Sequence, residues 1–153
     1  MEPQYQGNKE LLKRTLTAFL ASRTVQTNRV MTCYDWATSL DAETDCVVSG
    51  FQSPIEKDVL HFLLKKKIPV IVVLARSLYK NIPEELQEAF DAGRVLFISI
   101  SNNPRNSNAA GKQRNQYVTE LAQQTVFGML SEQSSLYDLY LKFKENRRNV
   151  VIL

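Results

Sequence analysis

Short apolar runs alternate with longer amphipathic stretches along the whole chain. Six of the runs lack the regular polar positions that mark a strand with one solvent-facing side. Such runs are typical of strands that are covered on both faces, as in a parallel sheet. They predict strands at Leu16–Ala21, Cys46–Ser49, Pro69–Leu74, Arg94–Ser99, Thr125–Leu130 and Asn149–Leu153.

Between these runs, apolar residues recur at the spacing of a helix. Val59, Leu60 and Leu63 fall on one side of such a stretch. Another stretch opens at Pro83, which suits the first helical turn, and stops at Gly93. The predicted helices are Thr27–Leu40, Pro54–Lys66, Pro83–Gly93, Gln113–Gln124 and Ser135–Asn146, and 101–111 is predicted to be a loop. This alternation predicts an α/β fold with an open, doubly wound, mostly parallel, Rossmann-like sheet in three layers.

Composition narrows the class of protein. A chain of 153 residues, 44% hydrophobic and 23% charged, predicts a single folded domain over 1–153 and excludes disorder. Two cysteines and one histidine are too few for a disulfide framework or a His-based metal site, so we expect no metal and no cofactor. The sequence shows neither a membrane-spanning run nor a signal-peptide pattern, and we expect a cytoplasmic protein with reduced thiols.

Candidate chemistry lies where the predicted strands end, because open α/β sheets bind ligands at the carboxyl ends of their strands. Those junctions are rich in serine, and three of the five carry a basic residue. Serine hydroxyls, arginine forks and helix N-termini suit phosphate, although serine is also a common helix cap. The candidate phosphate-binding or nucleic-acid-binding residues are Ser49, Gly50, Arg76, Arg114, Asn115, Ser134 and Ser135.

Other charged residues have a structural interpretation beside a functional one. The stretch 101–119 contains Arg105, Lys112 and Arg114 without an acid, and is either a phosphate-contacting surface or a solvated loop. Glu56 favours the positive end of its helix, or binds a ribose hydroxyl. The run 65–67 of three lysines is expected to complement a helix C-terminus. The absence of G-x-G-x-x-G and of a P-loop argues against a dinucleotide dehydrogenase or a P-loop NTPase.

The order of these motifs resembles the Rossmann-like domain of the DNA-processing protein A (DprA/Smf) family. The family's S-G-x-A-x-G-I-D loop reads S-G-F-Q-S-P-I-E over Ser49–Glu56, and Ile82-Pro83 stands where the family has Y-P. Arg114-Asn115 matches the first half of R-N-R-I, and the family's S-G-S-L reads Q-S-S-L over Gln133–Leu136. The resemblance spans roughly 16–140, nearly the whole chain.

The resemblance implies this fold and a module that binds single-stranded DNA or a nucleotide through phosphates, without catalysis of its own. It also makes a homodimer an expectation. Two other hypotheses stay open: cleavage of a nucleoside monophosphate N-glycosidic bond with Glu132 as the acid, and sensing of a nucleotide signal. The related LONELY GUY family cleaves nucleoside monophosphates with a P-G-G-x-G-T-x-x-E motif, which this sequence lacks.

Overall fold

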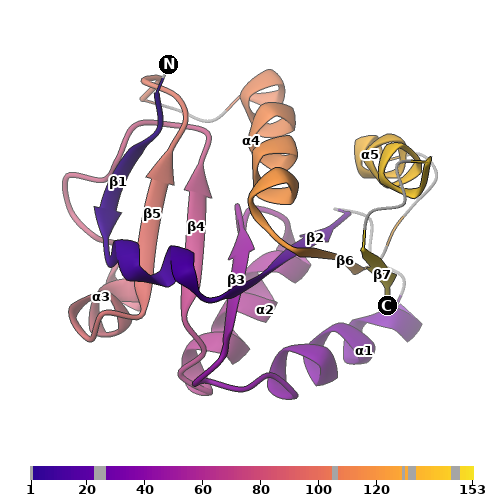
Figure 1. The fold of residues 1–153 in the computed structure, drawn as a ribbon, viewed down its shortest axis with the longest axis horizontal. Helices are drawn as coiled ribbons and strands as arrows, with labels where there is room; N and C mark the ends of the chain where they lie inside the picture. The colour runs from indigo at the N-terminus through magenta and orange to yellow at the C-terminus, as the bar shows by residue number, and fades with distance from the viewer. Residues whose placement is uncertain (1, 23–26, 105–106, 129, 131–133, 146–148) are drawn as a thin grey trace.

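The sheet is the frame of the structure, a computed structural model that describes residues 2–22, 27–104, 107–128, 130, 134–145 and 149–153 (Figure 1). Its seven described strands run in the order β1-β5-β4-β3-β2-β6-β7. Every neighbouring pair is parallel except β1 with β5, which is antiparallel at one edge. The strands are β1 (Gln4–Gly7), β2 (Thr15–Ala21), β3 (Asp45–Ser49), β4 (Val70–Leu74), β5 (Val95–Ser99), β6 (Gln124–Gly128) and β7 (Val150–Ile152).

Helices connect the parallel strands. They are α1 (Thr27–Thr38), α2 (Pro54–Lys65), α3 (Glu84–Asp91), α4 (Asn108–Leu121) and α5 (Ser135–Glu145), and a 3-10 helix, η1 (Lys9–Lys13), follows β1. None of the helices in the described part of the chain is both long and apolar enough to cross a bilayer.

These elements confirm the predicted α/β fold with a mostly parallel sheet, and a strand stands at each of the six predicted places. The sequence analysis missed β1 and η1, because Gln4–Gly7 is a largely polar segment with no apolar run to mark it. It was also wrong about the start of α4, which begins five residues before the predicted Gln113. The reason is a cap: the Ser107 hydroxyl accepts a hydrogen bond from the Ala110 N–H at 3.1 Å.

Two apolar clusters lie on opposite faces of the sheet, because successive strand side chains point to opposite sides. One cluster packs the sheet against Cys33 of α1, Val59 of α2 and Leu86 of α3. The other packs it against Val118 of α4 and Phe143 of α5. Figure 1 shows the result, with α4 crossing one face of the sheet and α2 behind the other. The predicted three layers are therefore present.

The chain changes direction across the sheet once. From β2 it proceeds through β3 and β4 to β5, and then β6 returns to the other side of β2. The helices change face at the same point, since α1 to α3 share one cluster and α4 and α5 share the other. Open α/β sheets bind ligands at such a switch point, outside the carboxyl ends of the strands. The carboxyl edge of the sheet at this switch point is therefore the expected place for a ligand.

The carboxylate of Glu56 ties the carboxyl end of β2 to the start of α2. Its Oε2 accepts a hydrogen bond from the Ala21 N–H at 3.0 Å, and its Oε1 accepts from the N–H groups of Gln52 at 2.9 Å and Ser53 at 3.2 Å. The Ser53 hydroxyl accepts the Glu56 N–H in return, which completes a capping box. Glu56 is 3% exposed. Its two oxygens therefore hold backbone, as the structural interpretation of this residue required.

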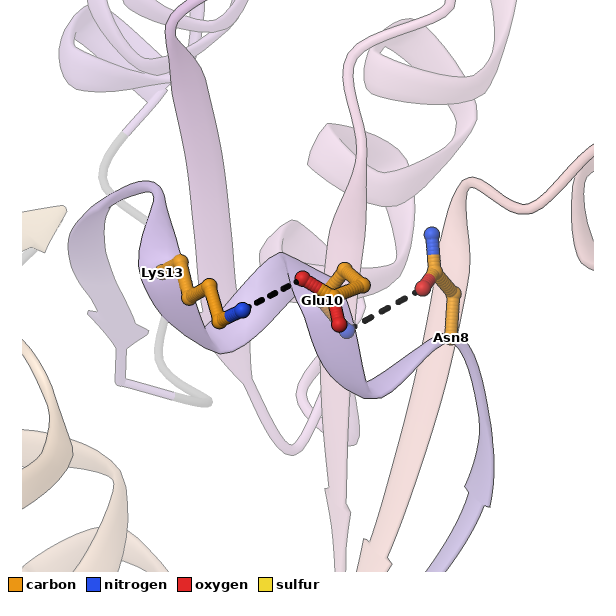
Figure 2. Close-up of polar contacts among 3 residues, drawn as sticks. All are labelled: Asn8, Glu10 and Lys13. Atoms are coloured by element: carbon orange, nitrogen blue, oxygen red, sulfur yellow. Dashed lines mark hydrogen bonds and ion pairs between the residues drawn. The ribbon is translucent and has the colours of Figure 1, made fainter.

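At the opposite edge of the sheet, Asn8 fixes η1 (Figure 2). Its Oδ1 accepts a hydrogen bond from the Glu10 N–H at 3.1 Å, and its Nδ2 donates to the Gly93 carbonyl at 2.8 Å. The Lys13–Glu10 ion pair of 2.8 Å is exposed to solvent, where such pairs contribute little. Asn8 is therefore the residue that joins η1 to the loop before β5.

Both cysteines are buried and unbridged. Burial raises the pKa of the Cys46 thiol to about 12 and also raises the pKa of Cys33. Cys33 packs beneath the end of β6, where a Cβ added to Gly128 would lie 2.7 Å from the Cys33 sulfur. Glycine at 128 therefore permits the close packing of β6 on α1.

We expect Glu56→Gln to lower the free energy of unfolding by about 1–3 kcal/mol, because the new amide N–H₂ would face a buried backbone N–H. Urea unfolding followed by circular dichroism measures this change. Glu88→Gln on the exposed side of α3 is the matched control, with an expected change below about 0.5 kcal/mol. Equal stability of the two variants would contradict the assigned role of Glu56.

We expect neither thiol of the folded protein to react with a disulfide reagent near pH 8, because the reaction needs an accessible thiolate. The raised pKa values keep both thiols protonated at that pH, and burial keeps the reagent away. Two thiols per chain should react in concentrated urea. Rapid labelling of either thiol under native conditions would show that α1 or β3 opens easily.

Candidate functional site

At the carboxyl end of β3, the Arg114 side chain of α4 packs directly on Gly50. A Cβ atom added at Gly50 would clash with Nε of Arg114 and lie 2.6 Å from its Cδ and 2.8 Å from its Cζ. Only glycine leaves room for this contact. Arg114 is 8% exposed, and its Nε and Nη2 donate to Oδ1 of Asn115 at 3.3 Å and 3.2 Å. The structure therefore brings together three of the predicted site residues: Gly50, Arg114 and Asn115.

Ser49 shapes the loop beside Gly50. Its side chain is fully buried, and its hydroxyl accepts a hydrogen bond from the Phe51 N–H at 3.0 Å. Phe51 has a φ of 51°, a left-handed conformation that a bulky residue rarely adopts. Its ring is buried in the core, which holds the residue in place. The hydroxyl of Ser49 thus supports the turn that presents Gly50.

The position of Arg114 on α4 differs from the expected one. The sequence analysis placed Arg114 and Asn115 at a helix start, where free N–H groups would help to hold a phosphate. Because α4 begins at Asn108, Arg114 is the seventh residue of the helix. Its backbone N–H therefore lies inside the helix, so a contact with a ligand would have to come from its side chain. The expectation of a helix N-terminus at this residue is corrected.

A groove of about 240 Å³ lies between α4 and α5, next to Asn115. Basic, acidic, amide and apolar side chains line it: Lys112, Asn115, Gln116, Leu136, Asp138, Leu139 and Lys142. The two lysine side chains suit an anion. The two amide side chains can donate hydrogen bonds to the edge of a nucleobase and accept hydrogen bonds from it. Asn115 joins the groove to the Gly50–Arg114 contact, since its Oδ1 also holds the guanidinium.

Arg76 follows β4, the neighbouring strand of β3. Its Nε donates to the Ser77 carbonyl at 3.2 Å, and its guanidinium lies 4.7 Å from the centre of the Tyr79 ring. The Ser99 hydroxyl lies 2.6 Å from the Arg76 carbonyl oxygen and fixes the backbone there. Arg76 is half-buried, so it keeps a positive charge at the carboxyl edge while stacked on an aromatic ring.

The two predicted serines lie where α5 begins. The Ser134 hydroxyl accepts a hydrogen bond from the Leu136 N–H at 3.1 Å, so this residue caps the first turn. Ser135 is the first residue of α5, and its side chain lies outside the described part of the structure. The candidate acid Glu132 and the basic residue Arg105 also lie outside the described residues.

Sequence reasoning missed the groove and the exact role of Glu56. The capping-box pattern S-x-x-E at Ser53–Glu56 was the signal that would have identified Glu56. No sequence signal marks the groove, because it depends on how α4 and α5 pack on the sheet. In the described part of the chain, no three His, Cys, Asp or Glu side chains are grouped in a way that would hold a metal ion.

Solved structures of similar fold come from two bacteria. DNA processing protein A from Streptococcus pneumoniae superposes with a TM-score of 0.80 at 20% sequence identity, over 98% of this chain and 54% of that one. DNA processing protein A from Helicobacter pylori, described for its single-stranded DNA binding mode, gives a TM-score of 0.79 at 17% identity, over 98% of this chain and 70% of that one. At such identities the likeness shows the fold, and this chain spans about half of the pneumococcal protein.

Sequence comparison supplies the family. No curated protein matches the chain. The sequence profile of the family described as DNA recombination-mediator protein A matches residues 4–152, nearly the full length. The match covers the strands of the sheet, the loop at Gly50 and the helix that carries Arg114. The chain therefore belongs to the DNA recombination-mediator protein A family, as its motifs indicated.

Proposed function

We propose that this domain binds single-stranded DNA at the carboxyl edge of its sheet, holding phosphates without turning over the nucleic acid. The observation that carries the proposal is the Arg114 guanidinium, which lies against the bare backbone of Gly50. Family membership supports the proposal, as does the Helicobacter pylori relative, which is described as binding single-stranded DNA.

The chemistry of the Gly50–Arg114 contact suits a phosphate. A guanidinium presents a planar fork that matches two phosphate oxygens, and it stays charged at any physiological pH. Because Gly50 has no side chain, the Arg114 guanidinium lies directly against the backbone there and has a defined position at the carboxyl edge. Arg76 adds a second positive charge at the end of the adjacent strand, and Ser134 and Ser135 stand at the start of α5.

The groove between α4 and α5 extends this contact. Lys112 and Lys142 would hold the next phosphates, while Asn115 and Gln116 would hydrogen-bond to an unpaired base. An unpaired base is needed, because the Watson–Crick edge of a duplex is not free to meet the two amides. The groove is also partly apolar through Leu136 and Leu139, which suits the face of a base. These features favour a single strand over a duplex.

We expect Arg114→Gln to weaken binding of a labelled single-stranded oligonucleotide about 10- to 100-fold, the usual worth of a charged hydrogen bond. The slope of log K against log salt should also become shallower by about 0.7, because one phosphate contact is lost. Fluorescence anisotropy at several salt concentrations measures both quantities. AMP should displace the oligonucleotide, since it carries the same phosphate.

Lys66→Gln is the control for this experiment, because it removes one positive charge at the exposed C-terminus of α2. It should change neither affinity nor salt slope appreciably. Unchanged binding by Arg114→Gln would contradict the site. Tight AMP binding without oligonucleotide binding would replace the proposal with nucleotide sensing, and release of free adenine from AMP would replace it with glycosidic cleavage.

We expect Gly50→Ala to weaken oligonucleotide binding to a similar extent, because its methyl group would displace the Arg114 side chain. Gly111→Ala is the matched control. A Cβ at Gly111 would lie 3.8 Å from Nη2 of Arg114, an ordinary contact, and alanine is favoured by about 0.5–1 kcal/mol inside a helix. Gly111→Ala should therefore bind normally and unfold at a higher temperature. Normal binding by Gly50→Ala would show that the contact does not position Arg114 for the ligand.

A further inference from the structure

Lys67 occupies a backbone position that normally belongs to glycine. The helix α2 ends in a Schellman motif, in which the Lys67 N–H donates to the Leu64 carbonyl at 3.1 Å and the Ile68 N–H donates to the Leu63 carbonyl at 2.9 Å. This motif places Lys67 in the left-handed region, with a φ of 58°. A side chain there is strained, whereas glycine is not. A lysine at this position complements the helix C-terminus but keeps a backbone strain that glycine would relieve.

The Lys67 side chain lines a pocket of about 410 Å³ between α2 and α3. Lys65 at the end of α2 and Arg94 just before β5 line the same pocket, and Glu85 and Glu88 of α3 do so as well. The pocket lies at the amino ends of β4 and β5. In Figure 1 the arrows of these two strands point away from α3, so the carboxyl edge with Gly50 is at the other end of the sheet.

The three cations of this pocket have no fixed partner in the part of the chain that the structure describes. Among the described residues, the side chains of Lys65, Lys67 and Arg94 make no hydrogen bond or ion pair, although two carboxylates line the same pocket. The like charges of Lys65 and Lys67 at the end of α2 and of Arg94 before β5 repel one another, and an anion bound among them would relieve that repulsion. A concave site is better suited to a small anion than to an extended polymer.

We propose that this pocket binds a small phosphorylated molecule that also carries hydroxyl groups, such as a sugar phosphate. Lys65, Lys67 and Arg94 hold the phosphate. Glu85 and Glu88 accept hydrogen bonds from the hydroxyl groups. Inorganic phosphate has no hydroxyl group remote from its charged oxygens, so it cannot make the same contact. The site is separate from the proposed DNA site, and neither assignment depends on the other.

The test is thermal unfolding of the full chain with ribose 5-phosphate, inorganic phosphate and ribose, each alone. Ribose 5-phosphate should raise the Tm most, inorganic phosphate less, and ribose not at all. Arg94→Gln should remove the shift. Lys66→Gln is the matched control, because Lys66 precedes Lys67 but does not line the pocket. It should keep the full shift.

Lys67→Gly separates binding from stability. Glycine relieves the strained backbone, so the Tm without ligand should rise by roughly 2–4 °C. The shift caused by ribose 5-phosphate should nevertheless disappear. A variant that is more stable yet no longer responds cannot have lost the response through misfolding.

Four results would overturn the proposal. They are a full shift in Lys67→Gly or Arg94→Gln, a lost shift in Lys66→Gln, no shift in the unmodified protein, and inorganic phosphate acting as strongly as ribose 5-phosphate. Loss of the shift in Arg114→Gln would move the phosphate to the carboxyl edge. Tighter binding of a glutamate-rich peptide than of ribose 5-phosphate would assign the pocket to an acidic protein partner instead.

Discussion

The carboxylate of Glu56 is the interaction on which the carboxyl edge of this domain depends. It accepts hydrogen bonds from three backbone N–H groups, one at the end of β2 and two in the loop after β3. A buried backbone N–H group without a partner costs free energy. The Glu56 side chain supplies that partner both at the end of β2 and in the loop after β3. The loop can then leave β3 through Gly50 and the left-handed Phe51 without losing its position. The hydrogen bonds of the Glu56 carboxylate therefore fix the backbone surface on which Arg114 packs.

The two ends of the sheet differ in how they use charge. At the carboxyl edge, Arg114 is buried on Gly50 and held by Asn115, so its guanidinium has a defined position. At the amino edge, Lys65, Lys67 and Arg94 meet in an open pocket. A planar guanidinium held in one position suits a phosphate of defined orientation. Lysine ammonium groups on flexible stems suit anions of varied shape. Both edges follow from the same parallel sheet, because its loops gather at the two ends of the strands.

Membership of the DNA recombination-mediator protein A family rests on nearly the whole chain, and the two bacterial structures repeat the fold at low identity. Low identity with a conserved architecture is the behaviour expected when packing needs only apolar residues of suitable size. The family's later glycine and aspartate are Pro54 and Glu56 here, and both belong to the first turn of α2.

The sequence by itself determined the α/β class, the places of the six parallel strands and the belonging to this family. Buried strands need continuous apolar runs, and those runs are visible in one dimension. The sequence also named Gly50 and Arg114 as candidate residues of one site, and the structure places the two in contact. Only the tertiary structure decided the rest: that β1 completes an edge despite its polar residues, that Ser107 starts α4 early, and that Asn115 lines a groove. These features depend on contacts between residues far apart in the chain, and no local pattern encodes them.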